Sequence, residues 1–254
     1  MGKSHDEQLR ALGARLADAL GDNLVTLMLF GSRIRPGYAV EHGDLNLFVI
    51  VRDASTAALR PVEAAVAQWL KRRDTHPPVV VSEDEWRASA DVFPIEVEDM
   101  REAHELLAGT DPFDGIQTSP TDLRHELERE LRGKLLQLRA AYVAAAPDGK
   151  ATTRLLLDSV GTFFVLMRAL VRLVGGTPGA DPETLVRQAA KTAGLDAGAF
   201  TWVVEKISGH TVQALRPYDP VGARYVDEIE KMARFVDRYP PAEVASGLPG
   251  PGAD

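Results

Sequence analysis

The chain has 254 residues and a formal net charge of −8, and 45% of its residues are hydrophobic. This composition is ordinary for a globular protein, and an acidic chain is a poor partner for the phosphates of nucleic acids. The absence of cysteine excludes disulfides, thiolate zinc sites and a cysteine nucleophile. The first 20 residues lack the continuous apolar core of a signal peptide, so we expect a cytoplasmic protein.

Helical patterns and short apolar runs alternate in the first half of the chain. Residues 5–20 are expected to be helical, because four leucines recur there at helical spacing. The apolar runs at 24–30, 45–51 and 78–82 have the length of buried strands. Residues 55–73 have the pattern of a helix. This order of elements predicts a small α/β half.

Residues 93–99 show a period of two. Ile95 and Val97 alternate with Glu96 and Glu98, and this alternation predicts a strand whose carboxylates share one face.

From residue 121 the sequence shows helical patterns only, and the whole excess of acidic charge lies before that point. We expect five helices, at roughly 122–145, 151–174, 181–193, 199–208 and 222–238. The second of them is apolar nearly all round but carries four charged residues. It is therefore predicted to be the centre of a bundle and not a membrane span.

These elements predict an α/β fold with a mixed sheet and flanking helices, followed by an all-helical bundle. The expected domains are residues 1–118 for the sheet and 119–240 for the bundle. Residues 241–254 are rich in proline and glycine and are expected to be a disordered tail.

Gly31 and Ser32 directly follow the strand predicted at 24–30. Glycine allows unusual backbone angles and the close approach of a ligand. If a helix begins next, its free N–H groups and the Ser32 hydroxyl can hold a phosphate. Arg33 and Arg35 follow the serine and are candidates to contact the phosphate. Solvated charge is the alternative interpretation of both arginines. A plain turn is the alternative interpretation of the glycine-serine pair.

Three side chains are candidate metal ligands. Asp44 and Asn46 lie two residues apart on an extended segment, so both side chains leave the same face. Glu96 stands on another predicted strand. Mg²⁺ prefers hard oxygen ligands, which carboxylates provide. Asn46 offers only a neutral carbonyl oxygen.

Gly31-Ser32, then Asp44-x-Asn46, then a later carboxylate form an order that resembles the nucleotidyltransferase superfamily. The resemblance is greatest to the small bacterial enzymes that include kanamycin nucleotidyltransferase and the minimal nucleotidyltransferases, and it covers roughly residues 24–100. It implies that Gly31 and Ser32 hold the phosphates of an NTP, either ATP or GTP. It also implies that Asp44 and Glu96 are the first and third carboxylates of a site for two Mg²⁺ ions. The implied reaction passes a nucleoside monophosphate to an acceptor hydroxyl on a small molecule or a protein.

Asn46 departs from the family pattern, which has Asp-x-Asp. Two metal ions about 3.5–4 Å apart need bridging anionic charge, and an amide in place of a carboxylate removes one negative charge. Either the chain binds a nucleotide with one metal and does little chemistry, or Glu41, Glu98 or Asp99 compensates. The alternative function is therefore a catalytically inactive module that binds a nucleotide or a partner.

Glu130 and Lys134 lie four residues apart on the helix predicted at 122–145. One interpretation is a pair that stabilises the helix. In the other, this helix lines the cleft, Lys134 meets a phosphate, and Glu130 is the general base toward the acceptor hydroxyl. The acceptor cannot be read from the sequence. A homodimer is compatible with it, and we expect no membrane or nucleic-acid partner.

Overall fold

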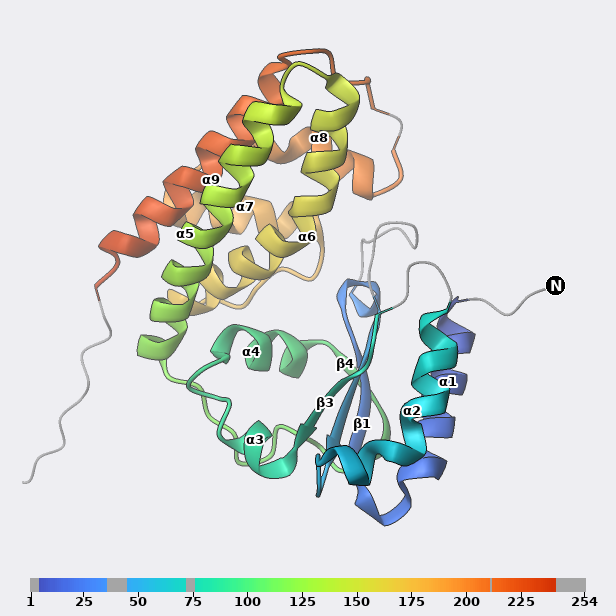
Figure 1. Ribbon diagram of the computed structural model, residues 1–254. Coiled ribbons are helices and arrows are strands. Elements are labelled where there is room, and N and C mark those ends of the chain that lie inside the picture. The colour runs from blue at the N-terminus through green and yellow to red at the C-terminus, as the bar shows by residue number, and fades with distance from the viewer. Residues whose placement is uncertain (1–4, 36–44, 72–75, 211, 241–254) are drawn as a thin grey trace, which may run out of the picture.

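The computed structural model describes residues 5–35, 45–71, 76–210 and 212–240. A sheet with helices on both faces forms one half of the molecule, and a bundle of helices forms the other (Figure 1). The sheet has the strand order β3-β2-β1-β4. Its strands are β1 Leu24–Phe30, β2 Asn46–Val51, β3 Val79–Ser82 and β4 His104–Gly109.

The central strand β1 pairs antiparallel with both β2 and β4, whereas β2 and β3 run parallel. This mixed sheet, with a helical region behind it, is the predicted fold class, which is confirmed. The apolar runs that predict strands at 24–30, 45–51 and 78–82 are strands in the structure.

Each face of the sheet has its own core. Leu27 and Leu47 face helices α1 (His5–Leu20) and α2 (Thr56–Leu70). Met28 and Phe48, which alternate with them along the strands, face the opposite side. There they pack with residues of the short helices α3 (Glu83–Arg87) and α4 (Pro94–Glu102), among them Trp86, Val97 and Met100.

The helices predicted in the second half are all present. They are α5 Pro120–Ala145, α6 Gly149–Leu173, α7 Pro182–Ala193, α8 Gly198–Ile207 and α9 Pro220–Arg238. Three of them begin with proline at the first helical position, directly after a Ser or Asp whose side chain accepts a backbone N–H. The fully buried Phe164, Met167 and Leu170 place α6 at the centre of the bundle. In the described part of the chain, no helix combines the length and the apolar character needed to cross a membrane.

The predicted strand at 93–99 is wrong, because these residues belong to helix α4. The helix lies between the two halves of the molecule and buries two opposite faces. Ile95 packs into the core of the bundle, whereas Val97 and Met100 pack under the sheet. Residues two apart on a helix point in nearly opposite directions, so burial on both sides produces an alternation that resembles a strand.

The strand β4 was not expected from the sequence. It ends at Gly109, which lies opposite Thr26 of β1 and has φ of +87°. A Cβ atom at this position would lie 2.0 Å from the carbonyl oxygen of Val25, so neither the backbone angle nor the space admits a side chain.

We expect Gly109→Ala to lower the free energy of unfolding by about 3 kcal/mol or more, since it adds a backbone clash to an unfavourable φ. Gly115→Ala is the matched control, because Gly115 also has a positive φ (+73°) but no atom within 4 Å of its would-be Cβ. The control should cost about 1 kcal/mol. Chemical denaturation of both variants measures the difference, and equal losses would contradict the clash.

Candidate functional site

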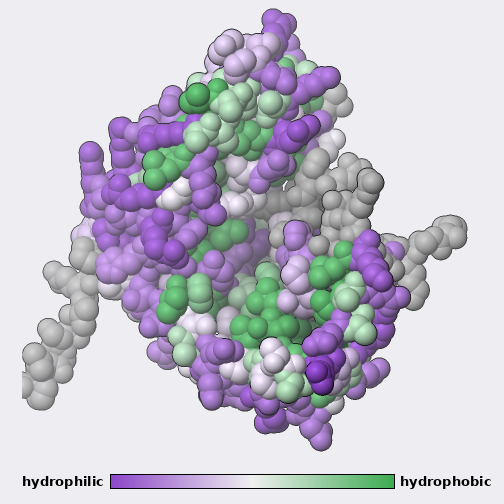
Figure 2. Space-filling model, in the orientation of Figure 1, coloured by the Kyte–Doolittle hydropathy of each residue, from purple (hydrophilic) through white to green (hydrophobic). Residues whose placement is uncertain are grey.

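A cavity of about 790 Å³ lies between the sheet half and the bundle. Its walls come from the ends of the strands, from α4 and from the helices α5 and α6. Figure 2 shows the corresponding hollow between the two halves of the surface. Five of the predicted site residues line this cavity, namely Gly31, Ser32, Glu96, Glu130 and Lys134.

The glycine-serine loop follows β1 directly, and its backbone requires a glycine. Gly31 has φ of 126° and ψ of 174°, angles that L side chains rarely adopt. Ser32 then begins η2 (Ser32–Ile34), a single turn of 3₁₀ helix. The expected helix after the glycine is therefore only this one turn, and the Ser32 residue lines the cavity.

Other predicted site residues lie elsewhere. Asn46 is the first residue of β2 and stands opposite Phe30, the last residue of β1. Neither Asn46 nor Arg33 is among the described residues that line the cavity. Asp44 and Glu41 lie outside the described residues.

Glu130 and Lys134 stand one turn apart on α5 and both line the cavity. Among the described residues, the ion partner of Glu130 is Arg129, at 3.2 Å, and not Lys134. Glu130 and Lys134 therefore do not form the helix-stabilising ion pair of the first interpretation. Both residues instead line the cavity.

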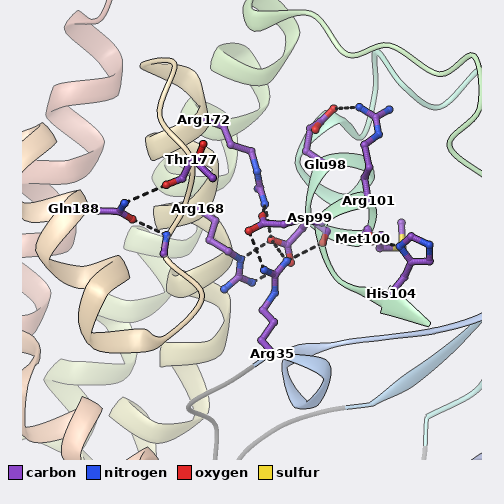
Figure 3. Close-up of polar contacts among 12 residues, drawn as sticks. Arg35, Glu98, Asp99, Met100, Arg101, His104, Arg168, Arg172, Thr177 and Gln188 are labelled. Carbon is purple, nitrogen blue, oxygen red and sulfur yellow. Dashed lines mark hydrogen bonds and ion pairs between the residues drawn. The ribbon is translucent and has the colours of Figure 1, made fainter.

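Asp99 on α4 is bound by three arginines that converge on it from two directions (Figure 3). Arg168 of α6 donates from Nη2 to Asp99 Oδ2 at 2.9 Å and also from Nε to Oδ1. Arg35, which directly follows η2, donates to the backbone carbonyl of Asp99 at 2.8 Å, and its Nη2 lies 3.2 Å from Oδ1. Arg172 contacts both Asp99 and Glu102.

This cluster connects the glycine-serine loop to the bundle through α4. The side chains of Arg35 and Arg168 are only 5% and 4% exposed. Burial alone would raise the pKa of Asp99, but the hydrogen bonds and charge of Arg168 and the charges of Arg35 and Arg172 lower that pKa below its ordinary value. Asp99 is therefore ionised at neutral pH and fixes the position of Arg35.

A comparison with solved structures finds a spectinomycin adenyltransferase from Enterococcus faecialis, determined with ATP and spectinomycin. The TM-score is 0.58 at 12% sequence identity, and the alignment covers 92% of this chain and 100% of that one. The chain has a nucleotidyltransferase-like fold. At this identity the likeness concerns the fold alone. No family model and no curated protein matches the chain.

In nucleotidyltransferase-like folds the metal ligands are expected on the sheet, and the described residues do not supply them. Within that part of the chain, no group of three histidine or acidic side chains could hold a metal ion. The residues of β3 that line the cavity are Val79 and Val81, which have no ligand atoms. Glu96, the predicted third ligand, stands on α4 and not on a strand.

Two of the three acids expected to compensate for Asn46 are described, and both are engaged in other contacts. Asp99 is held by the arginine cluster. Glu98 accepts from Arg101 at 2.7 Å and from the Thr118 hydroxyl at 2.6 Å. The described residues thus do not fit a site for two metal ions.

Glu126 of α5 is a buried carboxylate that sequence reasoning missed. Its Oε2 accepts the backbone N–H of Ile95 at 3.1 Å and so caps the first turn of α4 from a neighbouring helix. The side chain is 5% exposed, and among the described residues its ion-pair partner is Arg129, at 3.6 Å. The signal in the sequence is its place beside Leu127 and three residues after Leu123, at the edge of the buried stripe.

Acidic neighbours make this carboxylate costly to ionise. Burial raises the pKa of Glu126 from 4.5 to about 7, and the charges of Glu96 and Glu130 add to the shift. The pKa of Glu96 is raised as well, by loss of hydration and then by Glu130 and Asp99. Glu96, which lines the cavity, and Glu126 therefore hold protons more tightly than free carboxylates do.

The raised pKa predicts that Glu126 stabilises the fold at low pH and stabilises it less as the pH rises. The unfolded chain ionises this group near pH 4.5 and the folded chain near 7, so about 3 kcal/mol of stability is lost across that interval. Glu126→Gln keeps the acceptor for Ile95 and removes the titration. The wild-type minus variant difference in the free energy of unfolding, measured between pH 4.5 and 8, should show this loss.

Glu128→Gln is the control for that measurement, since Glu128 lies on the same helix but pairs with Arg132 at 2.9 Å outside the cavity. It should keep the pH dependence of the wild type between pH 4.5 and 7. If Glu126→Gln kept it as well, the assignment to Glu126 would be wrong.

Proposed function

We propose that the chain binds an NTP in the cavity between sheet and bundle and transfers its nucleoside monophosphate to a hydroxyl acceptor. The observation that carries the proposal is the convergence of Gly31, Ser32, Glu130 and Lys134 on one cavity, although they come from opposite halves of the chain. The solved structure that shares the fold is an adenyltransferase determined with ATP and spectinomycin, which supports an NTP as the donor.

The roles follow from the chemistry of each group. The backbone of Gly31 allows a phosphate to approach closely, and the Ser32 hydroxyl and the Lys134 ammonium donate to phosphate oxygens. The acceptor oxygen attacks the α-phosphorus, and the bond from that phosphorus to the bridging oxygen breaks, so that pyrophosphate leaves. Glu130 takes the proton from the acceptor hydroxyl. Its carboxylate is 29% exposed, which leaves it accessible to an acceptor in the cavity.

Three residues would bind a Mg²⁺ ion in this proposal. The proposed ligands are Asp44, Asn46 at the start of β2, and Glu96 on α4. The described residues do not form a two-metal site. A bound Mg²⁺ would neutralise charge on the phosphates.

The phosphate role of Ser32 predicts a loss of nucleotide affinity without a loss of fold. Ser32→Ala removes one hydrogen bond to a charged group and should weaken ATP binding by about 1.5–3 kcal/mol. Ser89→Ala is the matched control, since Ser89 lines the same cavity but its hydroxyl donates to the backbone carbonyl of Glu85. Isothermal titration with ATP or GTP compares the two, and equal affinities would leave Ser32 in a plain turn.

The proposed base predicts a loss of turnover without a loss of binding. Glu130→Gln should slow release of pyrophosphate from ATP by about 10²–10⁴-fold, because the amide cannot accept the proton. Glu128→Gln on the outer side of α5 should leave the rate unchanged. The assay uses a panel of hydroxyl compounds as acceptors, with mass spectrometry of the protein to detect self-modification. A Glu130→Gln rate equal to that of the wild type would exclude this base.

The second candidate function is a catalytically inactive module that binds a nucleotide. The amide at position 46 and the apolar side chains that β3 presents to the cavity favour it. Asn46→Asp restores a negative charge and should strengthen nucleotide binding only in the presence of Mg²⁺. Calorimetry with and without the metal tests this. Equal affinities of both proteins at saturating Mg²⁺ would remove position 46 from any metal site.

A further inference from the structure

One wall of the cavity has no part in the proposed phosphate chemistry. It is formed by Trp86 of α3, by Phe93 at the start of α4 and by Val79 of the edge strand β3. Phe93 and Val79 are 47% and 44% exposed, which is unusual for large apolar side chains. Figure 2 shows hydrophobic surface on the sheet half, beside the hollow.

The side chains of these three residues, which we call the apolar wall, offer no free hydrogen-bonding group to a ligand. The indole N–H of Trp86 already donates to the carbonyl of Pro112 at 2.7 Å. Its ring packs against Phe48, with the ring centroids 4.8 Å apart. The bundle supplies further apolar residues on the other side of the cavity, namely Leu157, Val160, Val165, Leu166 and Ile207.

We propose that the apolar wall binds a hydrocarbon part of the acceptor, such as an aromatic ring system, while the acceptor hydroxyl lies toward Glu130. This inference rests on the proposed function. The cavity volume of about 790 Å³ is near the upper end of the range of about 300–1,000 Å³ that holds one small ligand. Space therefore remains beside the phosphates of an NTP. Burial of the apolar wall by a hydrocarbon group is favourable, because it removes exposed apolar surface from water.

A nucleobase fits the apolar wall less well than a hydrocarbon group does. The edge of a base carries ring nitrogens and exocyclic groups that need hydrogen-bond partners when they leave water. Ser89 lies just after α3 and lines this cavity. Its hydroxyl already donates to the backbone carbonyl of Glu85. A base placed against the apolar wall would find no side-chain hydrogen-bond partner among its three residues, whereas a hydrocarbon group needs none.

The test compares two probe acceptors, the apolar alcohol 2-(2-naphthyl)ethanol and the polar compound spectinomycin. Binding of each is measured by ligand-observed NMR, with and without ATP. The wild type should bind the naphthyl alcohol more tightly than spectinomycin. Phe93→Ser should weaken the binding of the alcohol roughly tenfold, because it removes one apolar contact surface. The affinity for ATP should stay unchanged.

Val92→Ser is the matched control. Val92 is 53% exposed and neighbours Phe93 but does not line the cavity, so its replacement should leave the alcohol affinity unchanged. Tighter binding of spectinomycin, or no effect of Phe93→Ser on the alcohol, would overturn the inference. A fall in ATP affinity in Phe93→Ser would also overturn it, since the nucleobase would then occupy the apolar wall.

The binding of ATP and the binding of the alcohol test the proposed function and the inference separately. If the wild type does not bind ATP, the proposed function fails, and alcohol binding without nucleotide still decides whether the apolar wall binds a hydrocarbon group. If ATP binds and the alcohol does not, the proposed function stands and the inference about the acceptor fails.

Discussion

The buried carboxylate of Asp99 is the contact on which the arrangement of the two halves depends. It stands on α4 and is bound by Arg35 from the glycine-serine loop and by Arg168 and Arg172 from α6. Removing one partner of a buried ion pair typically costs about 3–5 kcal/mol, because the remaining charge is left without compensation. In this cluster three arginines would lose their shared partner. Ionised Asp99 therefore joins the loop, α4 and the bundle, together with the packing of Ile95 into the bundle core.

This contact also determines which groups reach the cavity. Since Asp99 faces the bundle, the opposite side of α4 turns Val97 and Met100 toward the sheet. The first turn of α4 then lies against α5, where Glu126 caps it and where Glu96 lies near Glu130. The position of α4 thus determines both the grouping of Glu96, Glu126 and Glu130 and the arginine cluster around Asp99.

Much of the fold could be predicted from the sequence. The bundle helices have both signals that define a helix, an apolar stripe and a capping residue with proline behind it. The apolar runs gave β1 and β2 nearly to the residue. The wrong prediction of a strand at 93–99 has a physical cause, because the apolar residues of a helix buried on two faces recur with the period of a strand. Pro94 with an acid two residues later was the overlooked sign of a helix start.

The candidate site could be predicted in part. One of the two interpretations of Glu130 and Lys134 places them on a cleft, and they line the same cavity as Gly31 and Ser32. The role of Asp99 could not be read from the sequence, since its partners lie 64 to 73 residues away along the chain. The capping of α4 by Glu126 depends in the same way on the packing of two helices. Local sequence patterns cannot predict such contacts, because the contacts form only when segments distant in the sequence pack together.

The central claim is that a nucleotide binds between the glycine-serine loop and α5. Hydrogen–deuterium exchange with and without ATP and Mg²⁺ tests it most directly, because it locates bound nucleotide without knowledge of the acceptor. The account predicts slower exchange on both sides of the cavity, in residues 30–35 and in the middle of α5 around Glu130 and Lys134. Protection confined to a different surface, such as the groove between α7 and α8, would contradict it.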